Sequence, residues 1–453
     1  ESPAGREPGR ACARAAWARR PRMRSVCVLG GSLSGLECAR LLAAAGLEVH
    51  IFRRLHDPSR SLFDLHPIYE YTPRAIPVPP SAEELRASAE RWARLGLVQD
   101  DSSRVGRIRT GQAFRPGSPT HRVCSVDGGF FGLLDALAEG MEGDAFDRQE
   151  IVAEIAPAPA GGWTATDIEG ASLGAFDSVV CCYDYFLRGT RKAAVRCLLE
   201  AALPAAAPVM RSVAGAVDCC AFALVAAVPG AERVPFDAAL VEGVPEVALA
   251  VRNPAAGHAA RGLPGHETWT LVATPQWTDE VRPNAKTWWD KGKTSQAMLS
   301  AFARLAGCKP GRGLRPPYHW GGFTCLTASQ SHGFAFDADA SLGFVGDFFH
   351  GHGADEALRS GAALARHMLS GAAASALPAP DDWAPRGRPS TDAEDTAALF
   401  GRPAGTEDHS WPTAAQLSAR GGLLPKGACA MDRYRRRGVK DADLARLQAE
   451  PSL

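Results

Sequence analysis

Three small residues near the start of the chain have the spacing of a phosphate-binding turn. Gly30, Ser32 and Gly35 follow the apolar run Ser25–Leu29 and precede an apolar-periodic segment. In such a turn the first position makes the bend, the second lets the backbone approach a pyrophosphate, and the third lets helix and strand pack closely. The phosphates then face the N-terminus of the helix. Ser32 keeps the middle side chain small but narrows that approach.

The end of the next apolar run, 47–52, carries a second signal. An acidic residue here commonly binds a ribose hydroxyl, but this chain has Arg53 followed by Arg54. A basic residue suits a phosphate, or has no ligand role. The strand at 25–29, the helix at 36–45 and the strand at 47–52 together predict the βαβ opening of a dinucleotide-binding domain.

A third signal lies far along the chain, at Gly346-Asp347. This pair ends an apolar strand and precedes a helix at 355–369. In flavoproteins such a Gly-Asp supplies a carboxylate near the ribityl or pyrophosphate groups. A plain turn aspartate is the alternative for the dipeptide alone. An FAD domain of the glutathione-reductase type returns to its nucleotide near the C-terminus, so the pairing with the first turn favours FAD.

The overall composition limits the classes of partner. The chain has 453 residues, with 50 basic and 50 acidic side chains and a pI near 7.3. Nucleic-acid binders usually carry a basic excess, so we expect a small-molecule substrate and no nucleic acid. No apolar run is long enough to span a membrane. The twelve cysteines form no C-x-x-C pair, and His350 and His352 lack an evident third ligand, so we expect no metal.

Several segments, in order, resemble the flavin-dependent amine-oxidase superfamily, and more narrowly its renalase-like branch. The resemblance spans roughly residues 24–370. It is carried by Ser25–Phe52, Phe63–Thr72 (FDLHPIYEYT), Phe176–Val180, Glu246–Asn253, Glu267–Trp277 (ETWTLVATPQW), Tyr318-His319-Trp320 and Leu342–Gly361. The chain departs from the family at Ser32, at Arg53, and in 53–62, where a Gly-Gly-Arg loop is missing.

The resemblance implies an α/β fold in which a discontinuous, Rossmann-type FAD-binding domain is interleaved with a β-rich α+β substrate domain. The FAD domain would comprise 24–75, 122–190 and 334–371, and the substrate domain 76–121 and 191–333. The residues expected to bind FAD are Gly30, Gly31, Ser32, Leu33, Ser34, Gly35, Arg53, Gly346, Asp347 and Asp355.

The implied activity is hydride transfer from a small reduced substrate to flavin, with oxygen as acceptor. The substrate would be a dihydropyridine nucleotide, related to NAD(P)H, or an amine. Trp277, His319 and Trp320 are the candidates for the substrate cavity, because flat aromatic walls suit a planar ring; core packing is the alternative. A binding or structural subunit of the same fold, with weak or no flavin, is the second functional hypothesis.

Both ends of the chain look like appendages. The first 24 residues hold seven arginines and two glutamates, and the first methionine is Met23. Residues 1–23 are therefore read either as an organellar transit segment or as sequence translated from upstream of a start at Met23. The Ala/Pro/Gly-rich tail 372–453 is a solvated appendage or a protein-partner site. We expect an intracellular, soluble protein, cytoplasmic or, with a transit segment, plastid or mitochondrial.

Overall fold

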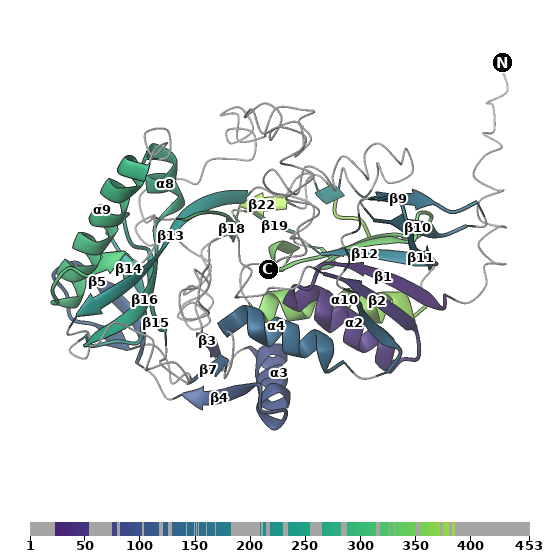
Figure 1. The fold of residues 1–453 in the computed structure, drawn as a ribbon, viewed down its shortest axis with the longest axis horizontal. Coiled ribbons are helices and arrows are strands. Elements are labelled where there is room, and N and C mark those ends of the chain that lie inside the picture. The colour runs from purple at the N-terminus through teal and green to yellow at the C-terminus, as the bar shows by residue number, and fades with distance from the viewer. Residues whose placement is uncertain are drawn as a thin grey trace, which may run out of the picture.

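The computed structural model describes residues within 23–385, with its longest gaps at 54–74, 183–208 and 254–264 and shorter gaps elsewhere. The segments 1–22 and 386–453 lie outside the described residues, and with them nearly all of the N-terminal extension and most of the expected tail. A six-stranded sheet with its helices lies on the right of Figure 1, and an eight-stranded sheet lies on the left.

The six-stranded sheet collects strands from distant parts of the chain. Its order is β20-β21-β12-β1-β2-β8, and every strand except the edge strand β20 runs parallel to its neighbours. Both central strands are buried on both faces, as parallel strands covered by other layers are. The strands are β1 (Ser25–Leu29), β2 (Glu48–Phe52), β8 (Ala145–Arg148), β12 (Ser178–Cys182), β20 (Ala335–Asp337) and β21 (Leu342–Val345).

The strand order of this sheet reverses beside β1. From β1 the chain adds β2 and then β8 on one side, and it later returns to add β12 and β21 on the other. In open parallel sheets, ligands bind outside the carboxyl ends of the strands at such a switch point. The turn that begins at Gly30 leaves β1 at this edge. The topology therefore points to the same turn as the sequence.

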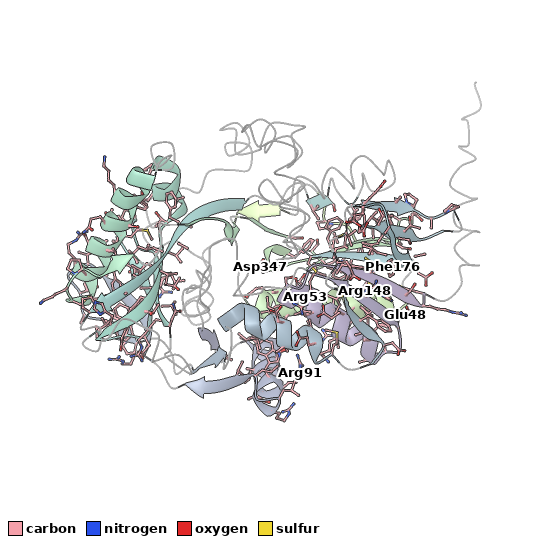
Figure 2. All side chains as sticks on the ribbon, in the orientation of Figure 1. Glu48, Arg53, Arg91, Arg148, Phe176 and Asp347 are labelled. Carbon is pink, nitrogen blue, oxygen red and sulfur yellow. The ribbon has the colours of Figure 1, made fainter. Side chains whose placement is uncertain are left out.

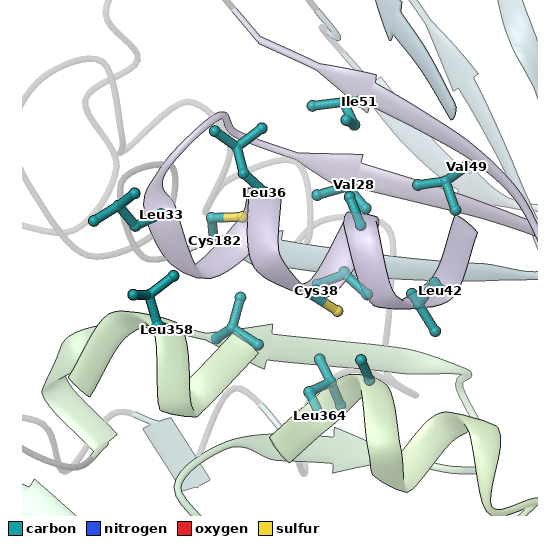
Figure 3. Packing of buried hydrophobic residues seen from close by; sticks show 14 of the residues in the cluster. Val28, Leu33, Leu36, Cys38, Leu42, Val49, Ile51, Cys182, Leu358 and Leu364 are labelled. Atoms are coloured by element: carbon teal, nitrogen blue, oxygen red, sulfur yellow. The ribbon is translucent and has the colours of Figure 1, made fainter. Parts of the chain in front are cut away.

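Helix α2 (Leu33–Ala44) is enclosed between this sheet and helix α10 (Ala354–Leu369), which explains why α2 is buried on nearly all sides. Figure 3 shows the packing, with Leu364 of α10 facing α2. The two helices approach so closely that a Cβ atom on Gly361 would overlap the main-chain oxygen of Ser34. Only glycine fits this crossing.

Two three-stranded antiparallel sheets flank the six-stranded sheet. The first packs Trp163 and Phe176 into the core on the face away from α2. The second carries helix α3, whose Trp92 enters the core shared by α2 and α10. The elements are β9 (Glu154–Pro157), β10 (Trp163–Thr166) and β11 (Ser172–Phe176), then β3 (Ala75–Val78), β4 (Val98–Asp101), β7 (His121–Ser125), α3 (Glu83–Arg94) and α4 (Gly129–Glu139).

The eight-stranded sheet has a core of its own. Its strands run in the order β17-β13-β16-β15-β14-β5-β6, with β18 also paired to β13. Trp269 lies 5.0 Å, between ring centroids, from Phe302 of α9, and both are buried. The elements are β5 (Val105–Arg109), β6 (Arg115–Pro116), β13 (Asp218–Pro229), β14 (Ala238–Glu242), β15 (Leu249–Asn253), β16 (His266–Val272), β17 (Arg312–Gly313), β18 (Tyr318–Cys325), α8 (Pro275–Val281) and α9 (Trp288–Ala306).

Two ranges differ from the simplest reading of the expected domains. The segment 76–121, expected in the substrate domain, has elements in both cores: α3 packs in the core of the six-stranded sheet, and β5 pairs in the eight-stranded sheet. Part of the expected tail is bonded to the fold, because β22 (Trp383–Pro385) pairs with β19 (Thr327–Ser329). Among the described helices, none is long and apolar enough to cross a membrane.

Candidate functional site

The turn between β1 and α2 is as tight as a phosphate-binding turn requires. Gly30 has φ +109°, a left-handed conformation that favours glycine. A Cβ atom on Gly35 would lie 2.8 Å from the Gly30 carbonyl oxygen and would overlap the Cys182 sulfur. The first and third positions therefore act as expected, one making the bend and the other the close packing. This geometry fits a dinucleotide pyrophosphate at the helix N-terminus.

Ser32, at the altered middle position, caps helix α2. Its backbone is extended (φ −72°, ψ 162°), and its hydroxyl accepts a hydrogen bond from the Gly35 N–H at 3.5 Å and lies 2.9 Å from the Ser34 hydroxyl. The cap thus gives the Gly35 N–H, one of the donors of the first turn, a hydrogen-bond acceptor. Leu33 and Ser34 begin the helix, where N–H groups point away from the helix body without intrahelical partners. The serine thus keeps the turn in shape and leaves donors for an anion.

The second flavin signal lies at the same edge of the sheet. β21 pairs with β12 and β12 with β1, so Gly346-Asp347 and the Gly30 turn leave carboxyl ends on opposite sides of the switch point. The Gly346 N–H donates to the buried Ser360 hydroxyl of α10 at 3.0 Å. In Figure 2, Arg53 and Asp347 lie at the end of this sheet that faces the middle of the molecule. The fold therefore brings together segments that are far apart in sequence.

Arg53 is fully engaged with carboxylates. Its Nε and Nη2 donate to the two oxygens of Asp147 at 2.8 and 2.7 Å, and its Nη1 donates to Asp135. Its side-chain stem lies against Gly31, where an added Cβ would be 2.7 Å from the Arg53 Cδ. The sequence left two roles open for Arg53, phosphate binding or no ligand role. The structure shows a further one, because the residue forms ion pairs with two carboxylates and its stem covers Gly31 of the turn.

Asp355 is turned toward α3. Its Oδ1 accepts the Leu85 N–H at 2.9 Å, and the Arg359 guanidinium lies 4.0 Å away. Helix α3 has Ala82 as its N-cap residue and no side-chain cap of its own, so Asp355 supplies the missing acceptor. Burial raises the pKa of the Asp355 carboxyl, and the hydrogen bond from Leu85 opposes that rise. In this structure the residue joins two helices.

The cysteines beside the turn are buried thiols. The Cys182 Sγ lies 3.4 Å from the Gly30 carbonyl oxygen, with which it hydrogen bonds. Burial raises the pKa of Cys27, Cys38 and Cys181. Because the thiolate is the reactive form of cysteine, these three are not candidate nucleophiles.

The substrate-cavity candidates lie with the other sheet. The Trp277 ring packs edge-on against Phe222, with centroids 6.3 Å apart, and the Trp277 backbone N–H donates to the Thr274 hydroxyl. His319 is the β18 register partner of Phe222, and Trp320 is that of the next residue back in β13; their side chains lie outside the described residues. Trp277 thus contacts Phe222, and His319 and Trp320 belong to the strand that pairs with this part of β13. Figure 1 shows α8 apart from the turn before α2.

Comparison with known proteins gives the fold. No family model and no curated protein sequence matches the chain. Among solved structures, it is similar to a triple mutant of putrescine oxidase from a redesign of cofactor binding (TM-score 0.50, 13% identity, 77% of this chain and 99% of that one). It is also similar to an oxidoreductase from Methanosarcina mazei (TM-score 0.51, 13% identity, 76% and 100%).

The likeness to these two structures shows a shared fold, which is an α/β fold with a Rossmann-type parallel sheet. The predicted α/β class, with a Rossmann-type sheet assembled from separate stretches of chain, is confirmed. Sequence reasoning missed Asp135 and Asp147 as partners of Arg53. Asp147 lies in the short strand β8, which pairs with β2, whereas nothing in the sequence around Asp135 points to this contact.

Proposed function

We propose that the protein is an FAD-dependent oxidoreductase. The observation that supports this most strongly is the position of Gly30–Gly35 and Gly346-Asp347 on the two sides of one switch point. A pyrophosphate at the α2 N-terminus and the remainder of the cofactor along the edge toward Asp347 fit this arrangement. The proposed FAD domain is the discontinuous one, 24–75, 122–190 and 334–371, which contains all six strands of the six-stranded sheet.

More narrowly, we propose a renalase-like reaction. The chemistry that FAD supplies when bound is acceptance of a hydride from a small reduced substrate, with dioxygen as the final acceptor and hydrogen peroxide as product. A dihydropyridine nucleotide or an amine is the proposed substrate. The support is the ordered resemblance of residues 24–370 to that branch. The chain's own task is to hold the cofactor and to orient the substrate ring against it.

The proposed substrate contacts are Trp277, His319 and Trp320. What supports them is that Trp277 packs on Phe222 and that His319 and Trp320 of β18 pair with Phe222 and Ala221 of β13. The Phe222 N–H donates to the Thr278 hydroxyl at 3.0 Å, so α8 is fixed on this strand. An aromatic group on a rigid strand would hold a planar ring with little loss of side-chain entropy.

The test is the visible spectrum of the purified full-length chain. Flavin absorption bands that correspond to about one flavin per chain support the proposed oxidoreductase. A colourless protein that does not bind added FAD contradicts it and favours the binding-subunit hypothesis. Gly35→Ala should weaken flavin retention by roughly tenfold or more, because overpacking costs about 1–3 kcal/mol. Gly292→Ala is the matched control, since an added Cβ there meets nothing within 4 Å. Equal flavin content in both variants would place the nucleotide elsewhere.

A further inference from the structure

The chain that follows α10 is bonded to the edge of the six-stranded sheet. The sequence alone favours a solvated appendage or a protein-partner site over 372–453, yet Ala376 forms an antiparallel bridge with Phe336 of β20. The N–H of each residue donates to the carbonyl of the other at 2.8 Å. The Ser375 hydroxyl also accepts the Ala338 N–H at 2.9 Å. An edge strand presents unpaired main-chain groups, and this segment pairs with part of the edge of β20.

Side chains of the same segment enter the cores on both faces of the sheet. Ala376 is buried in the core that contains α2 and α10, whereas Leu377 packs against the core on the opposite face. Successive residues of a strand point to opposite faces, so the segment continues the sheet as a short added strand. Pro378, the next residue, is also buried. Proline restricts the chain even before it docks, so less entropy is lost on docking.

A second attachment lies further along the chain, where β22 pairs with β19 in antiparallel register. The central pair joins Ala384 of β22 to Ala328 of β19. Because Pro385 has no N–H to donate, so short a ladder depends on this central pair. In Figure 1, β19 and β22 lie between the two large sheets. Residues 375–385 thus form a strap with one attachment at β20 and another at β19.

Strand β19 links the proposed substrate strand to the proposed flavin edge. It follows β18, which carries His319 and Trp320, after a single residue. It also lies beside the 3-10 helix η3 (Asp347–Phe349), which begins with the aspartate of the Gly-Asp pair. Ser329 of β19 and Phe349 of η3 are both buried. The strap therefore reaches the Asp347 segment through β19.

We propose that the strap is a positioning element of the site: it holds β19 against η3 and so keeps Asp347 at the edge where the flavin is proposed to lie. The Ser360 hydroxyl fixes the neighbouring Gly346 N–H from the α10 side, and the strap fixes η3 from the β19 side. The inference rests on the proposed function for the identity of the ligand. It goes beyond that function, because it gives a role to a segment outside the nucleotide motifs.

The experiment compares Ala384→Pro with Ala384→Gly in the full chain. The proline removes a ladder donor at the centre of β22, whereas the glycine, the matched control, keeps that N–H. The first readout is amide hydrogen exchange in η3, where the Phe349 N–H donates to the Gly346 carbonyl at 3.4 Å. Exchange there should be about two- to tenfold faster in Ala384→Pro, which is the worth of one main-chain hydrogen bond. The glycine variant should change it less.

The second readout is flavin retention, which a merely structural role of the strap would not alter apart from stability. Where the wild-type chain holds flavin, Ala384→Pro should release it about two- to tenfold faster on dilution. Exchange in the sheet of β9, β10 and β11 reports general loss of stability and should stay as in wild type. If Ala384→Pro does not fold, as judged by circular dichroism, Ser375→Ala takes its place, since it removes only the acceptor of the Ala338 N–H.

Four outcomes overturn the inference: unchanged exchange in η3, exchange that rises equally in η3 and in the β9–β11 sheet, an equal effect of Ala384→Gly, or flavin retention that does not follow the faster exchange. Failure of the proposed function is read separately, from the flavin content of the wild-type chain. A flavoprotein whose η3 does not respond to Ala384→Pro keeps the proposed function and loses the inference. A flavin-free chain whose η3 responds loses the oxidoreductase and keeps the hold of the strap on η3.

Discussion

The crossing of α10 over α2 allows one prediction to be worked out in detail. In Gly361→Ala the new Cβ would overlap the Ser34 main-chain oxygen and lie 3.0 Å from its carbonyl carbon and 3.1 Å from the Cys38 nitrogen. All three atoms are main chain and cannot rotate away. The helices must separate by about 1 Å before the contact becomes an ordinary one.

Overpacking a core costs about 1–3 kcal/mol, and we expect Gly361→Ala at the upper end, about 3 kcal/mol, because no side chain can yield. The separation also moves the α2 turn relative to the segment that Ser360 holds, so flavin retention should fall with stability. The assays are urea unfolding followed by circular dichroism, and flavin content after gel filtration.

Substitutions at two further glycines should change stability by different amounts, which allows the effects to be ranked. In Gly343→Ala the Cβ would lie 2.8 Å from the Leu364 Cδ2, the flexible end of a side chain, so the cost should be smaller. Gly292→Ala, in an open part of α9, should stabilise by about 0.5–1 kcal/mol through its helix propensity. The reasoning is refuted if Gly361→Ala unfolds at the same urea concentration as wild type and keeps the same flavin content.

Two carboxylates should give the stability opposite dependences on pH. Burial alone would raise the pKa of Asp237, but the Arg104 hydrogen bonds and the Arg252 charge lower it below the ordinary value of 3.8. The contribution of Asp237 to stability is therefore present above pH 3.8 and is lost as the pH falls. Asp237→Asn should make stability less dependent on pH in this acid range and should cost about 1–3 kcal/mol at pH 7. The pKa of Asp355 is raised by burial, so its contribution is complete below 3.8 and lost as the pH rises through the raised value. Asp355→Asn, which keeps an acceptor for the Leu85 N–H, should therefore be as stable as wild type or more so at pH 7, whereas Asp355→Ala should lose about 1 kcal/mol of stability. Urea unfolding at several pH values measures the free energy of unfolding of these variants. An Asn variant that is less stable than the Ala variant would contradict the capping role of Asp355.

The local pattern of the sequence predicted the elements that build the site. The strand at 25–29 is β1 residue for residue, and the helix after the glycine turn begins three residues earlier than expected, at Leu33. It begins earlier because Ser32 caps it, which a reading from apolar spacing does not register. Apolar periodicity and glycine spacing are local properties, so a single sequence carries them.

The contacts that Arg53 and Asp355 make in the structure are not local in sequence. Arg53 reads as a free cation from its neighbours in sequence, and only the pairing of β2 with β8 brings Asp147 to it. Asp355 reads as a ligand residue because it opens the last helix, and its partner Leu85 is 270 positions away. Charge pairing of this kind depends on which strands become neighbours, which composition and spacing leave open.

The position of α10 has a consequence for how the chain folds during synthesis. The β1–α2–β2 unit leaves the ribosome first, yet the helix that covers α2 spans Ala354–Leu369. At about 5–20 residues per second, more than 300 residues of further synthesis take roughly 15–60 s. For that time the side of α2 that packs against α10 has no native partner, and the two halves of the proposed nucleotide site lie on segments that are not yet in contact. The first half of the proposed site is thus synthesised early, but the site can be completed only after α10 has been made.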